Sequence, residues 1–374
     1  MKKGSEGMVG RFWWIAVLFL ALVISPMGAS ALECTKEKPC KLVFSTCYKE
    51  TFTSVKGAMW FMDEVTKRTN GRVVFDKYYS SGLLNCNDSL NGVSKGMADI
   101  SVDSEMYHID QLPLSNVLTI TFITSDPWVH AQALNELIAT EKVVAEEWTR
   151  NNIKHFYTCE VTPFQVFSKK PINKMEDLKG MKIRAVGPQA ATYAAMGAIP
   201  VAFNMPDIGD ALQKGTIDCA DTFCFDIGVI YKLHESAPYS IVNPMGCGGA
   251  QALEMNLAKY NSLPKDIQKI FDEVAQEAYD KYIPMAMEND RHYMDIFVKE
   301  GGKVIFLSPE ESKRWIEVGR APGEKWWLDQ MKNRKRDGEP VLKRFKELVA
   351  KWEKTGKSKY VDVYEYYKQK YLKK

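Results

Sequence analysis

Arg184 is the residue whose type and position best suit the recognition of a small anion. It lies in residues 181–186 (MKIRAV), a short apolar run that predicts a β-strand. Ile183 and Ala185 share one face of an alternating strand, so the guanidinium points to the other face. At the end of a strand in an α/β fold, that face opens on the crevice where ligands bind. A planar guanidinium suits a carboxylate better than lysine does, and the alternative is a structural ion pair with a neighbouring aspartate.

Signatures of catalysis are missing from the chain. It has no G-x-S-x-G elbow, no H-E-x-x-H motif, no P-loop and no G-x-G-x-x-G turn after a strand. Residues 246–249 (GCGG) precede a strand-like run, which predicts a turn or hinge instead of a phosphate cradle. We therefore expect no enzyme and no cofactor. The rival hypothesis, an exported enzyme acting on a carboxylate, has only Asp221 or a histidine to serve as acid or base.

Two similar units of alternating strands and helices position these residues. Each reads strand, helix, strand, helix, strand, which is typical of a parallel sheet covered by helices. In both units a helix ends at a glycine and an aspartate leads into the next strand, at 95–100 (KGMADI) and 214–219 (KGTIDC). The predicted strands are 41–46, 72–79, 99–102, 181–186, 199–203 and 217–220, and the predicted helices are 55–65, 88–95, 188–196 and 208–213.

The last third of the chain is dominated by helical patterns that suggest braces across the two units. Predicted helices span 265–282, 284–300, 309–319 and 338–352, with one strand at 303–307. The tail is basic and contains five tyrosines between positions 360 and 371. We expect a docked terminal helix with a solvated lysine face, and no nucleic-acid contact.

The N-terminus predicts export. Lys2, Lys3 and Arg11 precede a 13-residue apolar run, shorter than the roughly 20 residues needed to cross a bilayer, and small residues follow at 29–31 (ASA). We expect a signal peptide over residues 1–31 and a periplasmic protein. Losing three positive charges and Glu6 would lower the formal net charge from +3 to +1, which gives no reason to expect nucleic-acid binding.

All eight cysteines lie beyond residue 31, where export would expose them to oxidation. Eight cysteines allow about 105 complete pairings, and we favour Cys34 with Cys40 and Cys47 with Cys86. A zinc site is not expected, because no two cysteines are spaced C-x-x-C and the five histidines are scattered.

Three segments in succession carry a resemblance to a known family. They are 175–184 (MEDLKGMKIR), 196–206 (MGAIPVAFNMP) and 210–221 (DALQKGTIDCAD). Together with 69–73 (TNGRV), 169–172 (KKPI) and 261–268 (NSLPKDIQ), they resemble the substrate-binding subunits of tripartite ATP-independent periplasmic (TRAP) transporters, of the dicarboxylate-binding type. The likeness covers roughly residues 41–300.

The resemblance implies a two-lobed α/β "venus flytrap" with a hinge, strand-swapped segments and a long helix across both lobes. We expect lobe I to comprise 32–157 with about 250–290, lobe II 158–249 with about 291–340, and a helical tail at 341–374. Such a monomer would capture a small organic acid, a mono- or dicarboxylate, and deliver it to membrane subunits. A ligand-binding sensor partner remains a further alternative.

The resemblance also implies a set of ligand-binding residues. Arg184 would pair with the carboxylate of the ligand, and Tyr107 and Glu50 stand where the family lines its cleft. Gln165 and Asp221 match positions that hold a bridging cation in keto-acid-binding relatives. Thr222 replaces a common asparagine, and residues 162–165 lack a second arginine, which favours a monocarboxylate. Phenylalanines at 164, 223 and 225 suggest a nonpolar or aromatic part in the ligand, with core packing as the alternative for each.

Overall fold

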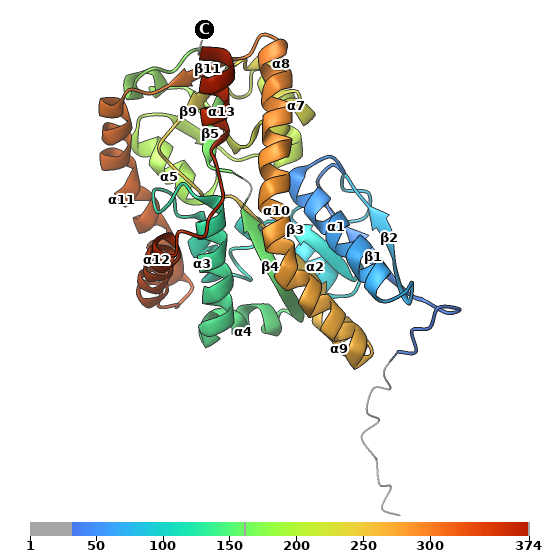
Figure 1. Ribbon diagram of the computed structural model, residues 1–374. Coiled ribbons are helices and arrows are strands. Elements are labelled where there is room, and N and C mark those ends of the chain that lie inside the picture. Colours follow the sequence, from blue (N-terminus) through green and yellow to red (C-terminus); the bar gives the residue numbers. More distant parts are fainter. Residues whose placement is uncertain (1–31, 161, 373–374) are drawn as a thin grey trace, which may run out of the picture. The chain divides into compact units, whose positions relative to one another are not determined.

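The computed structural model describes residues 32–160 and 162–372 of the 374-residue chain. The expected signal peptide, 1–31, lies outside the described residues. Everything described here belongs to one compact unit, residues 31–374. No helix in its described part is both long and apolar enough to cross a membrane. Two β-sheets form the centre of the unit, and we call each sheet with its helices a lobe (Figure 1).

Lobe I contains a five-stranded sheet in the order β2-β1-β3-β10-β4. Its first three strands are parallel and are joined by helices, which confirms the first predicted strand–helix repeat. Strand β10 is antiparallel to both β3 and β4, and α3, α4 and α9 pack against β4. The elements are β1 (Cys40–Ser45), α1 (Thr53–Arg68), β2 (Val73–Tyr78), α2 (Ser89–Ser94), β3 (Ile100–Asp103), α3 (Pro127–Thr140), α4 (Lys142–Arg150), β4 (Ile153–Glu160), β10 (Ala250–Asn256) and α9 (Leu257–Ser262).

Lobe II contains a six-stranded sheet in the order β11-β9-β5-β8-β6-β7. Strand β6 is parallel to β7 and β8, which confirms the second predicted repeat, whereas β5 is antiparallel to β8 and β9. The elements are β5 (Phe164–Ser168), β6 (Lys182–Arg184), α5 (Gly187–Ala195), β7 (Ile199–Val201), α6 (Ile208–Gln213), β8 (Cys219–Phe223), α7 (Phe225–Ile230), α8 (Leu233–Ser236), β9 (Tyr239–Val242) and β11 (Lys303–Phe306).

The strands themselves carry the chain between the lobes. β4 of lobe I leads into β5 of lobe II, and β9 of lobe II leads back into β10, which lies between β3 and β4. Residues 243–249 make the return, so the glycine-rich segment predicted as a turn or hinge is one of the two strand connections. This arrangement is the strand exchange that the resemblance implied.

Helix α10 (Lys265–Lys299) spans both lobes, as the resemblance implied. It packs against α1 and β4 on one side of the boundary and against α7 on the other (Figure 1). The helical patterns at 265–282 and 284–300 wrongly predicted a break, because the helix continues through Pro284. Buried Tyr282, Ile283 and Ala286 surround the proline, and this packing compensates for its missing N–H donor.

The C-terminal helices pack on both lobes. Helix α11 (Pro309–Asn333) packs on α5, whereas α12 (Glu339–Lys354) packs on α3 of lobe I. Helix α11 is longer than predicted because it continues past Gly319, whose missing side chain admits Met196; a Cβ there would lie 2.7 Å from the methionine methyl. Helix α13 (Val363–Tyr367) packs on α10, and its Tyr364 ring meets Phe225 and Phe306 of lobe II.

Two disulfides close the N-terminal part of lobe I. They join Cys34 to Cys40 and Cys47 to Cys86, as favoured from the sequence. The other four cysteines, at 159, 219, 224 and 247, are free and buried.

Candidate functional site

Arg184 ends strand β6 in lobe II and is almost completely buried, with 1% of its surface exposed. Its Nε–H donates to the carbonyl of Phe203 at 3.1 Å, and one terminal amino group donates to the carbonyl of Asp221 at 3.0 Å. Both acceptors are backbone oxygens. Among the residues that the structure describes, no carboxylate forms a hydrogen bond or ion pair with the guanidinium, so the alternative of a structural ion pair is not observed there.

The second terminal amino group of Arg184, NH2, is buried and has no hydrogen-bond partner among the described residues. An unpaired donor on a buried charge costs several kcal/mol, on the order of 1–3 for a neutral group and more for an ion. A carboxylate would satisfy that donor and offset the charge in the same contact. Two backbone hydrogen bonds therefore hold the Arg184 guanidinium, and one of its terminal amino groups is left without a partner among the described residues.

Asp221 positions the arginine through its backbone, not through its side chain. Its carboxylate accepts a hydrogen bond of 2.7 Å from the hydroxyl of Tyr193 on α5. Burial raises the pKa of Asp221 to about 7, and this outweighs the opposing effects of the Tyr193 hydrogen bond and the charge of Arg184. Burial thus favours the neutral form of Asp221, in which its carboxyl group does not offset the charge of Arg184.

Tyrosines from both lobes lie near Arg184. Tyr107, which follows β3, accepts a hydrogen bond of 3.3 Å from the backbone N–H of Met205 in lobe II. Burial raises the pKa of Tyr107 and of Tyr48, and the charge of Arg184 opposes the rise in each, which places both phenols within range of its field. Tyr231 of lobe II lies near Tyr48 and Tyr107, and its charge would raise the pKa of Tyr48 further, whereas the charge of Arg184 lowers it.

The structure does not bring Gln165 and Asp221 together. Gln165 pairs with Thr222 across β5 and β8, whereas Asp221 pairs with Val166, so their side chains point to opposite faces of the sheet. Gln165 accepts hydrogen bonds from the hydroxyls of Ser240, at 2.8 Å, and of Tyr364. Thr222 lies on the same face of the sheet as Gln165, two residues beyond Ala220, which pairs with Arg184 between β8 and β6. The buried Thr222 hydroxyl has no hydrogen-bond partner among the described residues.

The remaining expected residues lie in the core or at the surface. Phe164 packs edge-on against Phe223, and Phe225 packs against Phe167 and Phe297, which are contacts of a hydrophobic core. Glu50 is exposed. From the same loop, Tyr48 and Lys49 reach toward lobe II: the Lys49 ammonium donates to the carbonyl of Ile230 at 2.9 Å.

Sequence reasoning missed Tyr48, Tyr231 and the carbonyl of Phe203. Tyr48 comes two residues after the predicted strand 41–46 and Phe203 ends the predicted strand 199–203, but Tyr231 adjoins no element that the sequence predicted. Their meeting depends on how the lobes are apposed, which no local pattern encodes.

The comparisons with known proteins agree with this architecture. Residues 44–327 match the family described as bacterial extracellular solute-binding protein, family 7. A solute-binding protein of Albidiferax ferrireducens is 25% identical over 273 residues, which cover 70% of this chain and 77% of the relative. The C4-dicarboxylate-binding periplasmic protein DctP of Rhodobacter capsulatus is 23% identical over 306 residues, covering 78% of this chain and 89% of the relative.

Solved structures show the same two-lobed fold. A TRAP solute-binding protein from Rhodoferax ferrireducens T118, in complex with copurified benzoate, has a TM-score of 0.77 at 24% identity, covering 85% of this chain and 99% of its own. A TRAP periplasmic solute-binding protein from Desulfovibrio salexigens, described as an open complex, has a TM-score of 0.72 at 25% identity, covering 85% and 98%. The chain therefore belongs to the bacterial extracellular solute-binding proteins of family 7, the solute-binding proteins of TRAP transporters.

Proposed function

We propose that this TRAP solute-binding protein captures a small organic acid between its lobes, with the carboxylate on Arg184, and delivers it to membrane transport subunits. The observation that carries the proposal is the buried terminal amino group of Arg184, which has no hydrogen-bond partner in the part of the chain that the structure describes. A guanidinium held by two backbone carbonyls is already oriented, so an incoming carboxylate completes its hydrogen bonds without ordering the side chain first.

Related structures support a carboxylate as the common element of the ligands. The neighbours are described with benzoate, orotic acid, pyroglutamic acid and β-D-galacturonate, whose skeletons differ but which all carry a carboxyl group. Family members are receptors for solutes and not enzymes. The open complex described for the Desulfovibrio protein supports a cycle in which the lobes open to admit the ligand and close over it.

The residues around Arg184 favour a monocarboxylate with an aromatic or nonpolar part. Tyr48 and Tyr107 offer rings and hydroxyls there, and Tyr231 lies near both of them. No second arginine matches the position that dicarboxylate-binding relatives use, because residues 162–165 read TPFQ. Capture by Arg184 needs no cofactor. We propose that the protein acts as a monomer in the periplasm after residues 1–31 are removed.

A thermal-shift screen of organic acids tests the proposal. An acid at 100 times its dissociation constant should stabilise the protein by about 2.7 kcal/mol. Arg184→Ala should lose the shift for every acid, and Arg184→Lys should lose most of it because an ammonium lacks the planar fork. Arg314→Ala removes an exposed ion pair with Glu176 and is the matched control, which should keep the shift.

Ligand-free melting and circular dichroism of each variant separate lost binding from lost folding. Native mass spectrometry of the protein as purified would identify a retained acid directly. A folded Arg184→Ala protein that is stabilised as strongly as the wild type would remove Arg184 from the ligand site.

A further inference from the structure

Helix α1 of lobe I begins without a cap from its own neighbourhood. Phe52 precedes the helix, and no side chain there hydrogen-bonds the first N–H groups. Instead, the backbone N–H and hydroxyl of Thr53 donate to one carboxylate oxygen of Asp226, at 3.0 and 2.6 Å. Asp226 belongs to α7 of lobe II. A carboxylate at the start of a helix is favoured by both the free donors and the helix dipole, and here it comes from the other lobe.

A second contact crosses the same boundary in the opposite direction. The Lys49 ammonium donates to the carbonyl of Ile230, the last residue of α7, at 2.9 Å and lies 4.9 Å from the centre of the Tyr231 ring. Lobe I thus places a cation at the end of α7, while α7 places an anion at the start of α1. Both contacts involve side chains of the segment that also carries Tyr48.

The spanning helix α10 holds the two partners in place. The Asn289 amide donates to the Thr53 hydroxyl at 2.6 Å and to the Asp226 carboxylate at 3.3 Å. Asp290 accepts a hydrogen bond of 2.5 Å from the backbone N–H of Phe225, the first residue of α7. Thr53, Asp226 and Asn289 are all buried, so water does not compete for these bonds.

The backbone leading into α7 is strained. Cys224 has φ of 51° and ψ of 153°, a conformation that non-glycine residues rarely adopt. Such strain costs on the order of 1–3 kcal/mol and persists only where surrounding contacts impose it. The Cys224 thiol contacts the Asp226 carboxylate, so the strained residue and the cross-lobe cap belong to one network.

We propose that Lys49, Thr53 and Asp226 form an interlobe latch that stabilises the closed arrangement and holds Tyr48, which lies near Arg184, next to Tyr231 of the other lobe. The three residues act through lobe closure and do not themselves contact the captured acid. All the contacts are between protein groups, so we infer that the latch favours closure whether or not an acid is bound. The latch rests on the same lobe closure as the proposed capture of an acid. A measurement on the ligand-free protein tests the latch separately, because its result does not depend on whether any acid binds.

The test is small-angle X-ray scattering and hydrogen exchange of the ligand-free full chain. Asp226→Asn keeps the side-chain shape but removes the charge, and Thr53→Val removes only the hydroxyl. Each should enlarge the radius of gyration and speed exchange in residues 52–56, about tenfold for a lost charged hydrogen bond. Asp126→Asn is the matched control, because Asp126 caps α3 within lobe I through Trp128 and Val129, at 2.9 and 3.1 Å, and should leave the scattering unchanged.

Two outcomes would overturn the latch. In the first, Asp226→Asn and Thr53→Val both have the same scattering profile and exchange rate as the wild type. A ligand-free wild type that is already fully open would give this result and would equally contradict the latch. The other is an equal enlargement in Asp126→Asn, which would show general destabilisation. With benzoate as a probe acid, a working latch also predicts about tenfold faster dissociation from Asp226→Asn.

Discussion

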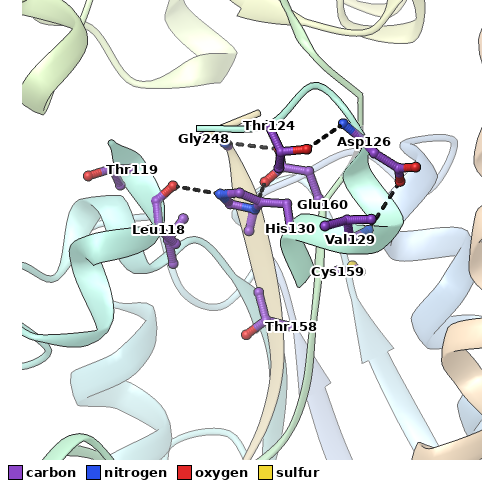
Figure 2. A network of polar contacts seen from close by, with 12 residues as sticks. Leu118, Thr119, Thr124, Asp126, Val129, His130, Thr158, Cys159, Glu160 and Gly248 are labelled. Carbon is purple, nitrogen blue, oxygen red and sulfur yellow. Dashed lines mark hydrogen bonds and ion pairs between the residues drawn. The ribbon is translucent and has the colours of Figure 1, made fainter. Parts of the chain in front are cut away.

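His130 faces Glu160 (Figure 2), with Nδ1 2.8 Å from Glu160 Oε2, and neither side chain has any exposed surface. The other ring nitrogen faces the carbonyl of Leu118 at 3.1 Å, and the second Glu160 oxygen accepts the N–H of Gly249 at 2.9 Å. A carbonyl only accepts hydrogen bonds, so Nε2 carries a proton. The pair joins the loop before α3 to the end of β4 and to the strand connection at 243–249, where both lobes meet.

Breaking the His130–Glu160 pair should destabilise the protein strongly. His130→Ala leaves a carboxylate buried without its partner, which costs roughly 3–5 kcal/mol. Urea unfolding followed by tryptophan fluorescence measures the loss. A double variant, His130→Leu with Glu160→Met, removes both polar groups and should recover most of the stability.

The His234–Glu300 pair supplies the control for that experiment. It is also a histidine–glutamate contact, but 51% of the Glu300 side chain is exposed. Glu300→Gln should therefore cost at most about 1 kcal/mol. Equal losses for Glu300→Gln and His130→Ala would show that burial does not set the strength of these pairs here.

The fold was predictable because its patterns are local. Alternating strands, glycine-terminated helices and the segment around Arg184 follow one another in sequence, and both strand–helix repeats were confirmed. The breaks expected at Pro284 and after Gly319 were wrong for a common reason. Contacts with distant elements sustain these helices, and propensity alone cannot weigh such packing.

The candidate site was predictable only in part. Arg184 could be proposed because its strand and its flanking residues are contiguous. The roles that we propose for Tyr48, Tyr231 and Asp226 depend on contacts with the opposite lobe, so no spacing rule reveals them. The family pattern places Gln165 and Asp221 around one cation. The register between β5 and β8 turns their side chains to opposite faces of the sheet, and neither segment alone predicts that register.

Asp221 should make stability depend on pH in a specific window. Burial raises its pKa from 3.8 to about 7, so the folded state holds a proton that the unfolded state releases. Stability is then highest below about pH 4, falls as the pH rises from 3.8 to about 7, and is constant above that, for this group alone. The pH dependence of urea unfolding measures it.

Asp221→Asn should abolish that contribution while keeping an acceptor for the Tyr193 hydroxyl. The difference between wild-type and variant stability should grow across the same window, in favour of the variant, by on the order of 1–4 kcal/mol. Glu105, whose pKa burial also raises to about 7, titrates in both proteins and cancels in the difference. A difference that is constant from pH 4 to pH 7, to within about 0.3 kcal/mol, would contradict the raised pKa.

The two disulfides should contribute unequally to stability. Cys47 and Cys86 are 39 residues apart, whereas Cys34 and Cys40 are separated by 6. A cross-link that closes a longer loop removes more entropy from the unfolded chain, about 4 kcal/mol for the long loop and about 2 for the short one. Serine pairs at each site, compared by urea unfolding, should therefore rank Cys47–Cys86 first, and the reverse order would exclude loop entropy as the main effect.

Gly246 should be the least replaceable residue of the strand connection at 243–249. Its φ is 72°, and a Cβ there would lie 2.4 Å from the backbone oxygen of Thr124, which cannot move aside like a side-chain tip. Gly71 has nearly the same φ, 77°, but nothing within 4 Å of its Cβ position. Gly71→Ala thus isolates the conformational cost, about 1–2 kcal/mol, and Gly246→Ala should add roughly 1–3 kcal/mol for the clash. Comparable unfolding free energies for the two variants would mean that the Thr124 backbone moves to accommodate the added Cβ. The loop before α3 would then not hold the strand connection at 243–249 in place.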